Sequence, residues 1–406
     1  MKKGNAFWRL VGYECRKAFL NPWMLVFLVV LLAVNGWKIQ DKYAQKVDRW
    51  EEYQDVYEEF YGRYVGAITV EKVSDLMTIY GPLQEKAETM SLNAVYDPNA
   101  YTYSEQEDYS FFSFLFYTEM QYDYLYVNEA YRIASNAAEL ADFYSGSGNA
   151  FGVGKNLQIA SHFSGRSIPA FSDTRGYEVL LNYDYSAMLV LLLTIFGLSG
   201  IFVTERETEM YMLLRTTKNG SGATVAAKLT AAVLFVVLVS GPFFLQDFLS
   251  VYIAGGRNQA LSSPVYALRY FETTPLDMTI GQYFLWAGAV KTLGILACGC
   301  VILLVSSLCR QVLTVFFASF GLLLGGVVLQ EFCRTRYVLK WFNPLELVIV
   351  RDIVTEDVFV NVFGFAVPLY VFVIAGVVLT MGLLVAGILY CNRSYHRRGG
   401  RRAVRV

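Results

Sequence analysis

The chain has 406 residues, of which 55% are hydrophobic, 16% aromatic and 17% charged, and its formal net charge is −1. Soluble domains carry about 25% charged residues, so this composition excludes an ordinary soluble protein as well as a disordered one. Six cysteines in so long a chain exclude a disulfide scaffold. The near-zero net charge excludes a globally basic nucleic-acid binder, so no nucleic-acid partner is expected. A membrane protein is the class that remains.

Six apolar runs are long enough to be membrane spans, because a helix needs roughly 20 apolar residues, within a range of about 17–25, to cross a bilayer. They are 19–37, 187–203, 229–245, a stretch within 283–308, 312–329 and 363–390. No A-x-A-like cleavage site follows the first run, which is therefore expected to be retained. The sequence predicts an all-α membrane protein with six transmembrane helices.

Lys and Arg are distributed unevenly along the chain. The first 20 residues hold five of them against one acid, Glu14, and the tail at 391–406 holds six arginines and no acid. Segment 38–183 holds 11 basic and 22 acidic residues, so its net charge is 11 − 22 = −11. Because cytoplasmic segments are enriched in Lys and Arg, we expect both termini in the cytoplasm and 38–183 outside a plasma membrane crossed several times.

The outer segment 38–183 is rich in tyrosine and has no cysteine, so it is expected to fold by packing alone, as a mainly helical domain. Aromatic and apolar residues recur every three or four positions over 41–65, which predicts a helix continuing the first span outward. Helices are also predicted over 70–90 and 111–143, and a Gly/Ser/Asn-rich loop over 146–164. The tyrosine stripe either packs between helices or forms a surface for an amphiphilic substrate. The acid excess either faces solvent or attracts cationic ligands.

The chain lacks the residue patterns of known catalytic sites. It has two histidines and no metalloprotease or nucleophile motif. Residues 148–156 look like a phosphate-binding loop, but Asn149 stands where a glycine is needed and Asn156 where Ser or Thr would hold Mg²⁺. We therefore expect no enzyme activity, no metal and no cofactor bound by this chain itself.

The predicted inner loop 204–228 has a distinct order of residues. A charged boundary is followed by a short amphipathic helix, a Gly/Ser turn and Lys228 at the start of the third span. Such a helix is typical of a docking element for a soluble partner, or of an interfacial helix lying in the lipid surface. The positions singled out are Glu205, Arg206, Glu207, Met210, Leu213, Leu214 and Arg215.

Glu-Arg-Glu at 205–207, Leu-Leu-Arg at 213–215 and Lys228 resemble the coupling region of ABC-type exporter permeases, the six-span type-two membrane subunits. The glycine that usually follows Glu-Arg-Glu is replaced by Glu209 or Met210. The resemblance implies that these residues couple the chain to a separate cytoplasmic ATPase, which would bind ATP and Mg²⁺. It also implies a homodimer or a heterodimer with a similar permease, in contact with membrane lipid.

Other segments are similar to parts of the same family. Residues 1–18 look like its amphipathic connecting helix, 304–310 like its tight inner turn, and the outer loop 330–362, with Asn343-Pro344, is where it has short outer helices. The large loop between the first two spans is common in bacterial members. The implied function is ATP-driven export of a hydrophobic or amphiphilic cargo, such as a peptide, lipid or drug. The alternatives are an antimicrobial-peptide sensing or immunity subunit and a non-transporting membrane anchor.

The sequence allows two positions for Lys291 relative to the fourth span. If the fourth span begins at Tyr283, Lys291 lies roughly 12 Å inside it and is expected to be functional. If the span begins at Thr292, Lys291 snorkels to the outer interface and 280–290 forms a short surface or re-entrant helix. We favour the second. No other acidic or basic residue is expected inside a span, which argues against a proton-coupled carrier.

Overall fold

The structure is a computed structural model that describes residues 3–46, 61–78, 105–208, 210, 222–254, 259–332 and 337–403. It contains six helices long and apolar enough to cross a membrane. They are α2 (Pro22–Lys46), α8 (Tyr185–Glu207), α10 (Gly222–Ala254), α11 (Ile280–Leu308), α12 (Val312–Phe332) and α14 (Leu369–Ala403). This confirms the predicted all-α, multi-pass membrane protein.

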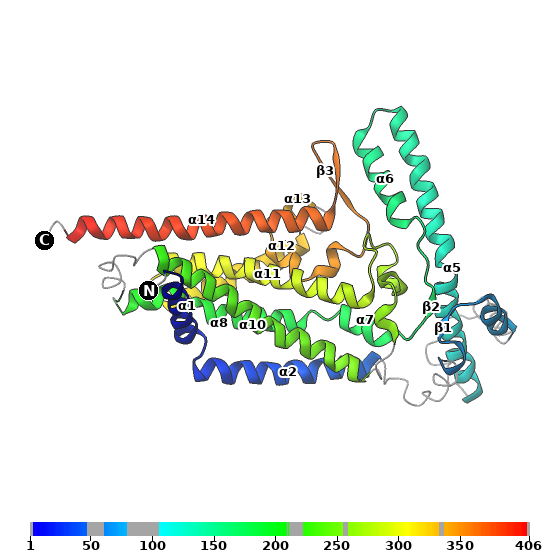
Figure 1. Cartoon of the computed structure of the whole chain (residues 1–406), viewed down its shortest axis with the longest axis horizontal. Coiled ribbons are helices and arrows are strands. Elements are labelled where there is room, and N and C mark those ends of the chain that lie inside the picture. Colours follow the sequence, from blue (N-terminus) through cyan, green and yellow to red (C-terminus); the bar gives the residue numbers. More distant parts are fainter. Residues whose placement is uncertain are drawn as a thin grey trace.

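The six helices lie side by side, with both chain termini at one end of the bundle and the long helices α5 (Glu105–Gly146) and α6 (Ala150–Phe163) at the other (Figure 1). The most enclosed of the six is α8, since 72% of its apolar stretch is buried, against 17% for α2 and for α12. A helix that is apolar on all sides is stable either in a core or against lipid. Thus α8 forms the centre, and α2, α12 and α14 present apolar side chains outward.

The third span is longer than predicted. Helix α10 begins at Gly222 and ends at Ala254, so it includes both Lys228 and Asp247, which are buried. The expectation that no charge other than Lys291 falls within a span is therefore wrong. Hydropathy placed the ends at these charges, but both side chains have partners on neighbouring helices, so neither has to end the helix.

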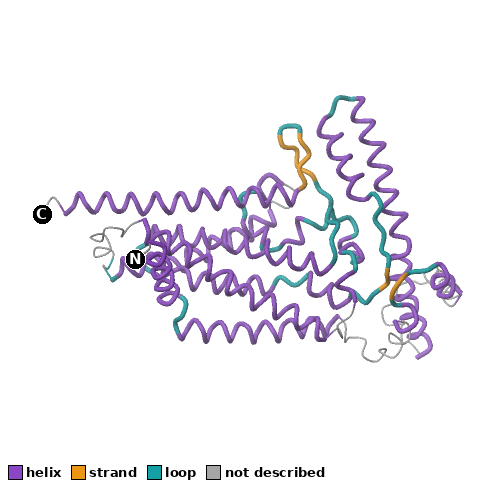
Figure 2. The backbone as a smooth tube through the Cα atoms, viewed as in Figure 1, coloured by secondary structure: helices purple, strands orange, loops and turns teal. Residues whose placement is uncertain are grey.

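The sixth span begins later than predicted, because 363–368 belongs to a hairpin and not to a helix. Strands β3 (Phe359–Val362) and β4 (Phe365–Pro368) pair antiparallel, and α14 starts directly after them. Phe363 and Gly364 form the turn with φ of 51° and 92°. Hydropathy alone cannot separate a short apolar strand from the start of a helix. Figure 2 shows strands only at the end of the bundle remote from the termini.

The predicted loop at 146–164 is wrong, because most of it forms α6. Asn149 caps this helix, its Oδ1 accepting a hydrogen bond from the Gly152 amide at 3.0 Å. A Cβ at Gly152 would lie 2.5 Å from Cγ of Tyr144, so this glycine is a packing residue between α5 and α6. Small residues here allow two helices to approach closely, whereas the sequence reading took them for loop residues.

The remaining elements are short. Residues 3–18 form a helix and 330–362 contains short helical turns, as the sequence predicts, whereas the other short elements were not predicted. The elements are α1 (Lys3–Ala18), α7 (Arg175–Leu181), α13 (Tyr337–Lys340), η2 (Gln259–Ser262), η3 (Val265–Ala267), η4 (Arg269–Phe271), η5 (Pro344–Leu347), η6 (Val350–Ile353), and the paired strands β1 (Gly66–Ala67) and β2 (Ala170–Phe171).

The region expected outside the membrane, called the outer region below, is built from more than 38–183. Tyr126 on α5 stacks on Tyr266 with ring centroids 4.9 Å apart, and Arg166 donates to the Thr274 carbonyl oxygen at 2.8 Å. The predicted helix at 111–143 is confirmed within α5, and residues 70–78 are helical. In the tyrosine stripe, Tyr43 and Tyr64 are buried, which supports the packing interpretation for these two. Positions 47–60 of the stripe lie outside the described residues.

Candidate functional site

Four charged side chains meet where α1, α8 and α10 come together near the termini; we call Glu14, Lys17, Glu205 and Lys228 the inner charge cluster. Lys228 Nζ lies 3.1 Å from Glu14 Oε2 and 2.6 Å from Glu205 Oε1, and it donates to the Ile201 carbonyl oxygen at 2.9 Å. Lys17 Nζ lies 3.2 Å from Glu205 Oε1. All three ammonium donors of Lys228 are therefore used.

The inner charge cluster is balanced and mostly buried. The side chain of Lys228 is only 2% exposed and that of Glu14 only 7%. Two buried charges of opposite sign are tolerated when each has close partners, and removal of one partner leaves the other uncompensated. The cluster therefore ties the distant helix α1 to α8 and α10, at the base of the loop that joins α8 to α10.

The two residues after Glu205 fix the turn between α11 and α12. Arg206 Nη1 donates to the Cys309 carbonyl oxygen at 2.9 Å, just beyond the end of α11. Glu207 Oε1 accepts a hydrogen bond from the Val312 amide at 3.0 Å, at the first residue of α12. Both contacts satisfy backbone groups that have no partner within their own helix, and a carboxylate at a helix N-terminus is electrostatically favourable.

The structure thus brings Glu205, Arg206 and Glu207 together, and each has partners within this chain. The Met210 side chain is 49% exposed. Leu213, Leu214 and Arg215 lie outside the described residues, so their predicted place on an amphipathic helix stays a prediction. The sequence reading missed Glu14, although it is the one acid among the basic residues of an apolar, helical N-terminal segment.

Lys291 is buried inside a continuous helix, so the favoured snorkelling interpretation is wrong. Helix α11 runs from Ile280 without a break at residue 291, and Lys291 is 9% exposed. The start of α11 is fixed by a capping box, in which Thr279 Oγ1 accepts from the Gln282 amide at 3.3 Å and Gln282 Oε1 accepts from the Thr279 amide at 3.0 Å.

Lys291 belongs to a second cluster at the other end of the bundle; we call Asp184, Lys291 and Arg351 the outer charge cluster. Lys291 Nζ lies 2.8 Å from Asp184 Oδ1, and Arg351 Nε lies 3.5 Å from Asp184 Oδ2. Lys291 also donates to the Tyr183 carbonyl oxygen at 3.1 Å, and Arg351 to that of Asn182 at 3.1 Å. Two cations thus lie beside the Asp184 carboxylate between α11, η6 and the start of α8, and Arg351 Nε also lies 3.6 Å from Asp352 Oδ1.

A hydrogen-bond network connects this region to α2 and α10. Asn35 Nδ2 donates to Asp247 Oδ1 at 2.7 Å, and the Tyr183 hydroxyl donates to Asn35 Oδ1 at 3.0 Å. All three side chains are buried. Because buried polar groups are costly without partners, this network specifies how α2, α8 and α10 pack at their outer ends. No pattern in the sequence pointed to it.

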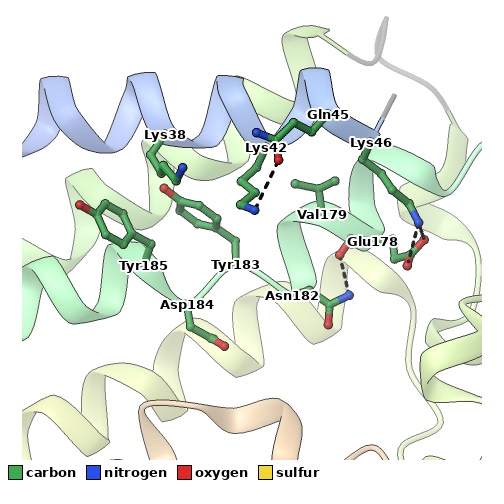
Figure 3. Close-up of a pocket in the computed structure, with 10 residues that line it drawn as sticks. All are labelled: Lys38, Lys42, Gln45, Lys46, Glu178, Val179, Asn182, Tyr183, Asp184 and Tyr185. Carbon is green, nitrogen blue, oxygen red and sulfur yellow. Dashed lines mark hydrogen bonds and ion pairs between the residues drawn. The ribbon is translucent and has the colours of Figure 1, made fainter. Parts of the chain in front are cut away.

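A pocket of about 540 Å³ opens between the outer end of α2 and the junction of α7 and α8. Figure 3 shows Lys38 and Lys42 of α2 on the side of Tyr183 and Tyr185 and Lys46 paired with Glu178, while the Asp184 side chain points away from α2. We call it the outer lysine pocket, and its lining residues are Lys38, Lys42, Gln45, Lys46, Glu178, Val179, Asn182, Tyr183, Asp184 and Tyr185.

A separate pocket of about 260 Å³ between α5 and η4 contains two acids one helical turn apart. Burial raises the pKa of Glu119 to about 7, against an opposing effect of Arg175. Burial raises the pKa of Asp123 to about 8, and the negative charge of Glu119 raises it further, while Arg269 opposes. Both acids lie outside the membrane spans. They therefore change charge near neutral pH, which most carboxyl groups do not.

We expect the outer region to lose stability as pH rises from about 4 to about 8. Above their ordinary pKa values near 4, Glu119 and Asp123 ionise in the unfolded chain while the folded chain keeps their protons, so ionisation favours unfolding until about pH 8. The total loss is about 2 kcal/mol or more. Hydrogen exchange of α5 amides at pH 5 and 8 measures it. The double variant Glu119→Gln with Asp123→Asn should show little change of stability with pH. The control Glu139→Gln, at an exposed position of α5, should lose stability as the native chain does. The same loss in the native chain, the double variant and the control would contradict the expectation.

Among the described residues, no three His, Cys, Asp or Glu side chains come together as ligands of a metal ion would. Polar features of the described bundle are the inner and outer charge clusters, the outer lysine pocket, the Asn35–Asp247 network and a buried pair in which Lys340 Nζ lies 3.2 Å from Glu346 Oε2. No protein-family model and no curated protein matches this chain.

Proposed function

We propose that this chain is the membrane-spanning permease subunit of an ATP-driven exporter of the ABC type, with its ATPase on a separate cytoplasmic chain. In this proposal both termini lie in the cytoplasm, 38–183 lies outside, and the membrane is a bacterial plasma membrane. A second permease, identical or similar, completes the translocation unit. The cargo is a hydrophobic or amphiphilic molecule, such as a peptide, lipid or drug.

The observation that carries the proposal is the bracing of the loop between α8 and α10. Glu205 ties the end of α8 to α1 and α10 through Lys17 and Lys228. Arg206 and Glu207 tie it to the turn between α11 and α12. Five helices therefore meet at the base of one loop. A force applied to that loop is passed to all five together, which is what coupling to an ATPase requires.

The mechanism follows from this connection. ATP binding closes the ATPase pair, and the loop seated on it moves with it. Because the loop is braced, the helices of one permease move as a group and rock against those of the second permease. A cavity between or beside the two permeases then opens outward. Glu205, Arg206 and Glu207 act in this scheme as positioning residues, while Met210, Leu213, Leu214 and Arg215 are the proposed contacts to the ATPase.

The test is an affinity pull-down of the full chain, solubilised in mild detergent from its native membrane, with identification of the proteins that co-purify. The variant carries Met210→Asp and Leu214→Asp, because a change at Glu205 would also break the inner charge cluster. The control is Leu157→Asp, at an apolar position of α6 that is 56% exposed. We expect a Walker-A ATPase with the native chain and the control, and about tenfold less with the variant, as for loss of interface anchors.

Three outcomes would contradict the proposal. Absence of an ATPase in several mild detergents would favour a non-transporting anchor. Equal recovery with the native chain and the variant would remove the loop as the docking element. An ATPase whose turnover rises with an antimicrobial peptide, without net transport of any cargo, would favour a sensing or immunity subunit.

A further inference from the structure

We propose that the outer lysine pocket binds a phosphate-bearing anion carried by a membrane amphiphile, with Lys42 as the anchoring cation. That this ligand is the transported cargo rests on the proposed function, whereas its binding does not.

The depth of the pocket is set by α2. Trp37 is 68% exposed and ends the apolar part of this helix, and exposed Trp residues mark the membrane–water interface. Lys38, Lys42 and Lys46 follow at intervals of four residues, so they share one helix face. At 1.5 Å per residue, Lys42 lies about 7.5 Å beyond Trp37. The headgroup layer of a bilayer extends about 5–8 Å beyond the hydrocarbon core on each side, so Lys42 is at headgroup depth.

The charge balance singles out Lys42. Lys38 Nζ pairs with Asp41 at 3.0 Å, and Lys46 Nζ pairs with Glu178 at 3.1 Å. Lys42 Nζ contacts an amide oxygen, Gln45 Oε1, at 3.5 Å, which is at the limit of a hydrogen bond. Its charge also acts on the Asp41 carboxylate, but that carboxylate is already held by Lys38. In the part of the chain that the structure describes, no carboxylate pairs with Lys42.

The carboxylates of the pocket do not compensate this lysine. Glu178 is held by Lys46, and Asp184 is already compensated by Lys291 and Arg351 behind the pocket wall. The lining therefore retains a positive charge even though the segment 38–183 as a whole is acidic. An anionic ligand is favoured at this place and a cationic one is disfavoured.

The size and walls of the pocket fit a headgroup. A volume of about 540 Å³ falls within the range of small-molecule sites, about 300–1,000 Å³. In Figure 3, Lys38 and Lys42 extend from α2 toward Tyr183 and Tyr185, so the cations and the aromatic rings face each other across the opening. A phosphate oxygen beside Lys42 Nζ would make a charge-assisted hydrogen bond, and the side of α2 below it would contact the acyl chains.

The test measures lipid binding to the full chain in detergent by native mass spectrometry, without any ATPase. The probes are phosphatidylglycerol, phosphatidylcholine and inorganic phosphate. We expect Lys42→Gln to weaken phosphatidylglycerol binding about tenfold or more, as for loss of a hydrogen bond to a charged group. Lys42→Arg should keep it within about threefold, since the charge is retained. Lys155→Gln on α6, which removes the same charge away from this pocket, should change nothing.

The other arms of the experiment identify the source of the anion and the ways in which the proposal fails. Phosphatidylglycerol that millimolar phosphate does not displace supports an amphiphile as the ligand, and displacement supports a free phosphate anion at the same lysine. Unchanged binding to Lys42→Gln, or phosphatidylcholine bound as tightly as phosphatidylglycerol, would overturn the proposal. Absence of an ATPase in the pull-down would leave these results untouched, so the two proposals fail separately.

Discussion

Replacing Lys228 by Met is expected to destabilise the folded chain by about 3–5 kcal/mol, the usual cost of removing one partner of a buried ion pair. Met fills a similar volume, so the loss comes from charge and not from packing. Glu14 would stay buried with no cation. Glu205 would keep Lys17, which is 3.2 Å away and whose side chain is 31% exposed, against 2% for Lys228. Few single substitutions in a folded protein have so large an effect.

The unfolding free energy of the full chain, measured by titration from mild detergent into denaturing detergent, tests this expectation. Adding Glu14→Gln to Lys228→Met removes the orphaned carboxylate charge and should recover most of the loss, because Glu205 and Lys17 still form a pair. Lys155→Met on α6 is the matched control: this lysine is half-buried and forms no ion pair among the described residues, so its replacement should cost under about 1 kcal/mol. A loss of less than about 1 kcal/mol for Lys228→Met would show that the inner charge cluster does not brace the helices.

The double variant also separates folding from coupling. With Lys228→Met and Glu14→Gln the chain should fold, and the loop beyond Glu207 is untouched, so the ATPase should still bind. The connection of α10 to α1 and α8 is weakened, however, because Lys228 of α10 no longer pairs with Glu14 and Glu205. Transport that falls while ATPase binding persists would support the bracing role; transport at the native rate would contradict it.

The six spans could be predicted from the sequence because the bilayer imposes one strong requirement, a run of about 20 apolar residues per helix. The ends of the spans could not. Lys228 and Asp247 were taken as boundaries, yet their partners Glu14 and Asn35 lie more than 200 residues away in the sequence. Pairings at such separation leave no local pattern, so hydropathy cannot show that a charge is neutralised within the bundle.

Some of the missed features were readable. The capping box at Thr279 and Gln282 follows the known spacing of Thr-x-x-Gln and sets the start of α11, which places Lys291 well inside the helix. The helix α6 was hidden by its composition, because Gly152 suggested a loop although it is required by the ring of Tyr144. The outer lysine pocket could not be foreseen, since α2 and the start of α8 are brought together only by the fold.

Replacing Lys291 by Met is expected to cost about 3 kcal/mol, the lower end of the range for a broken buried pair, because Arg351 remains 3.5 Å from Asp184. Asp184→Asn in the same chain should recover most of this loss. The titration with denaturing detergent measures both, and Arg310→Gln, at an exposed position between α11 and α12, is the control. Equal loss in the single and double variants would mean that packing, and not the uncompensated carboxylate, is responsible.

Lys291→Met, alone and combined with Asp184→Asn, also tests anion binding in the outer lysine pocket, because none of the pocket's lysines is changed. Once Lys291 is gone, the Asp184 carboxylate is only partly compensated and its field reaches the pocket that it lines together with Lys42. Phosphatidylglycerol should then bind about threefold or more weakly to Lys291→Met, since a negative potential opposes an anion. Adding Asp184→Asn removes that charge and should restore binding to the native level or above. Lys42 is intact in both variants. Binding that falls in Lys291→Met and recovers when Asp184→Asn is added would therefore show that the ligand responds to the charge balance of the pocket. Equal binding to the two variants would show that it does not.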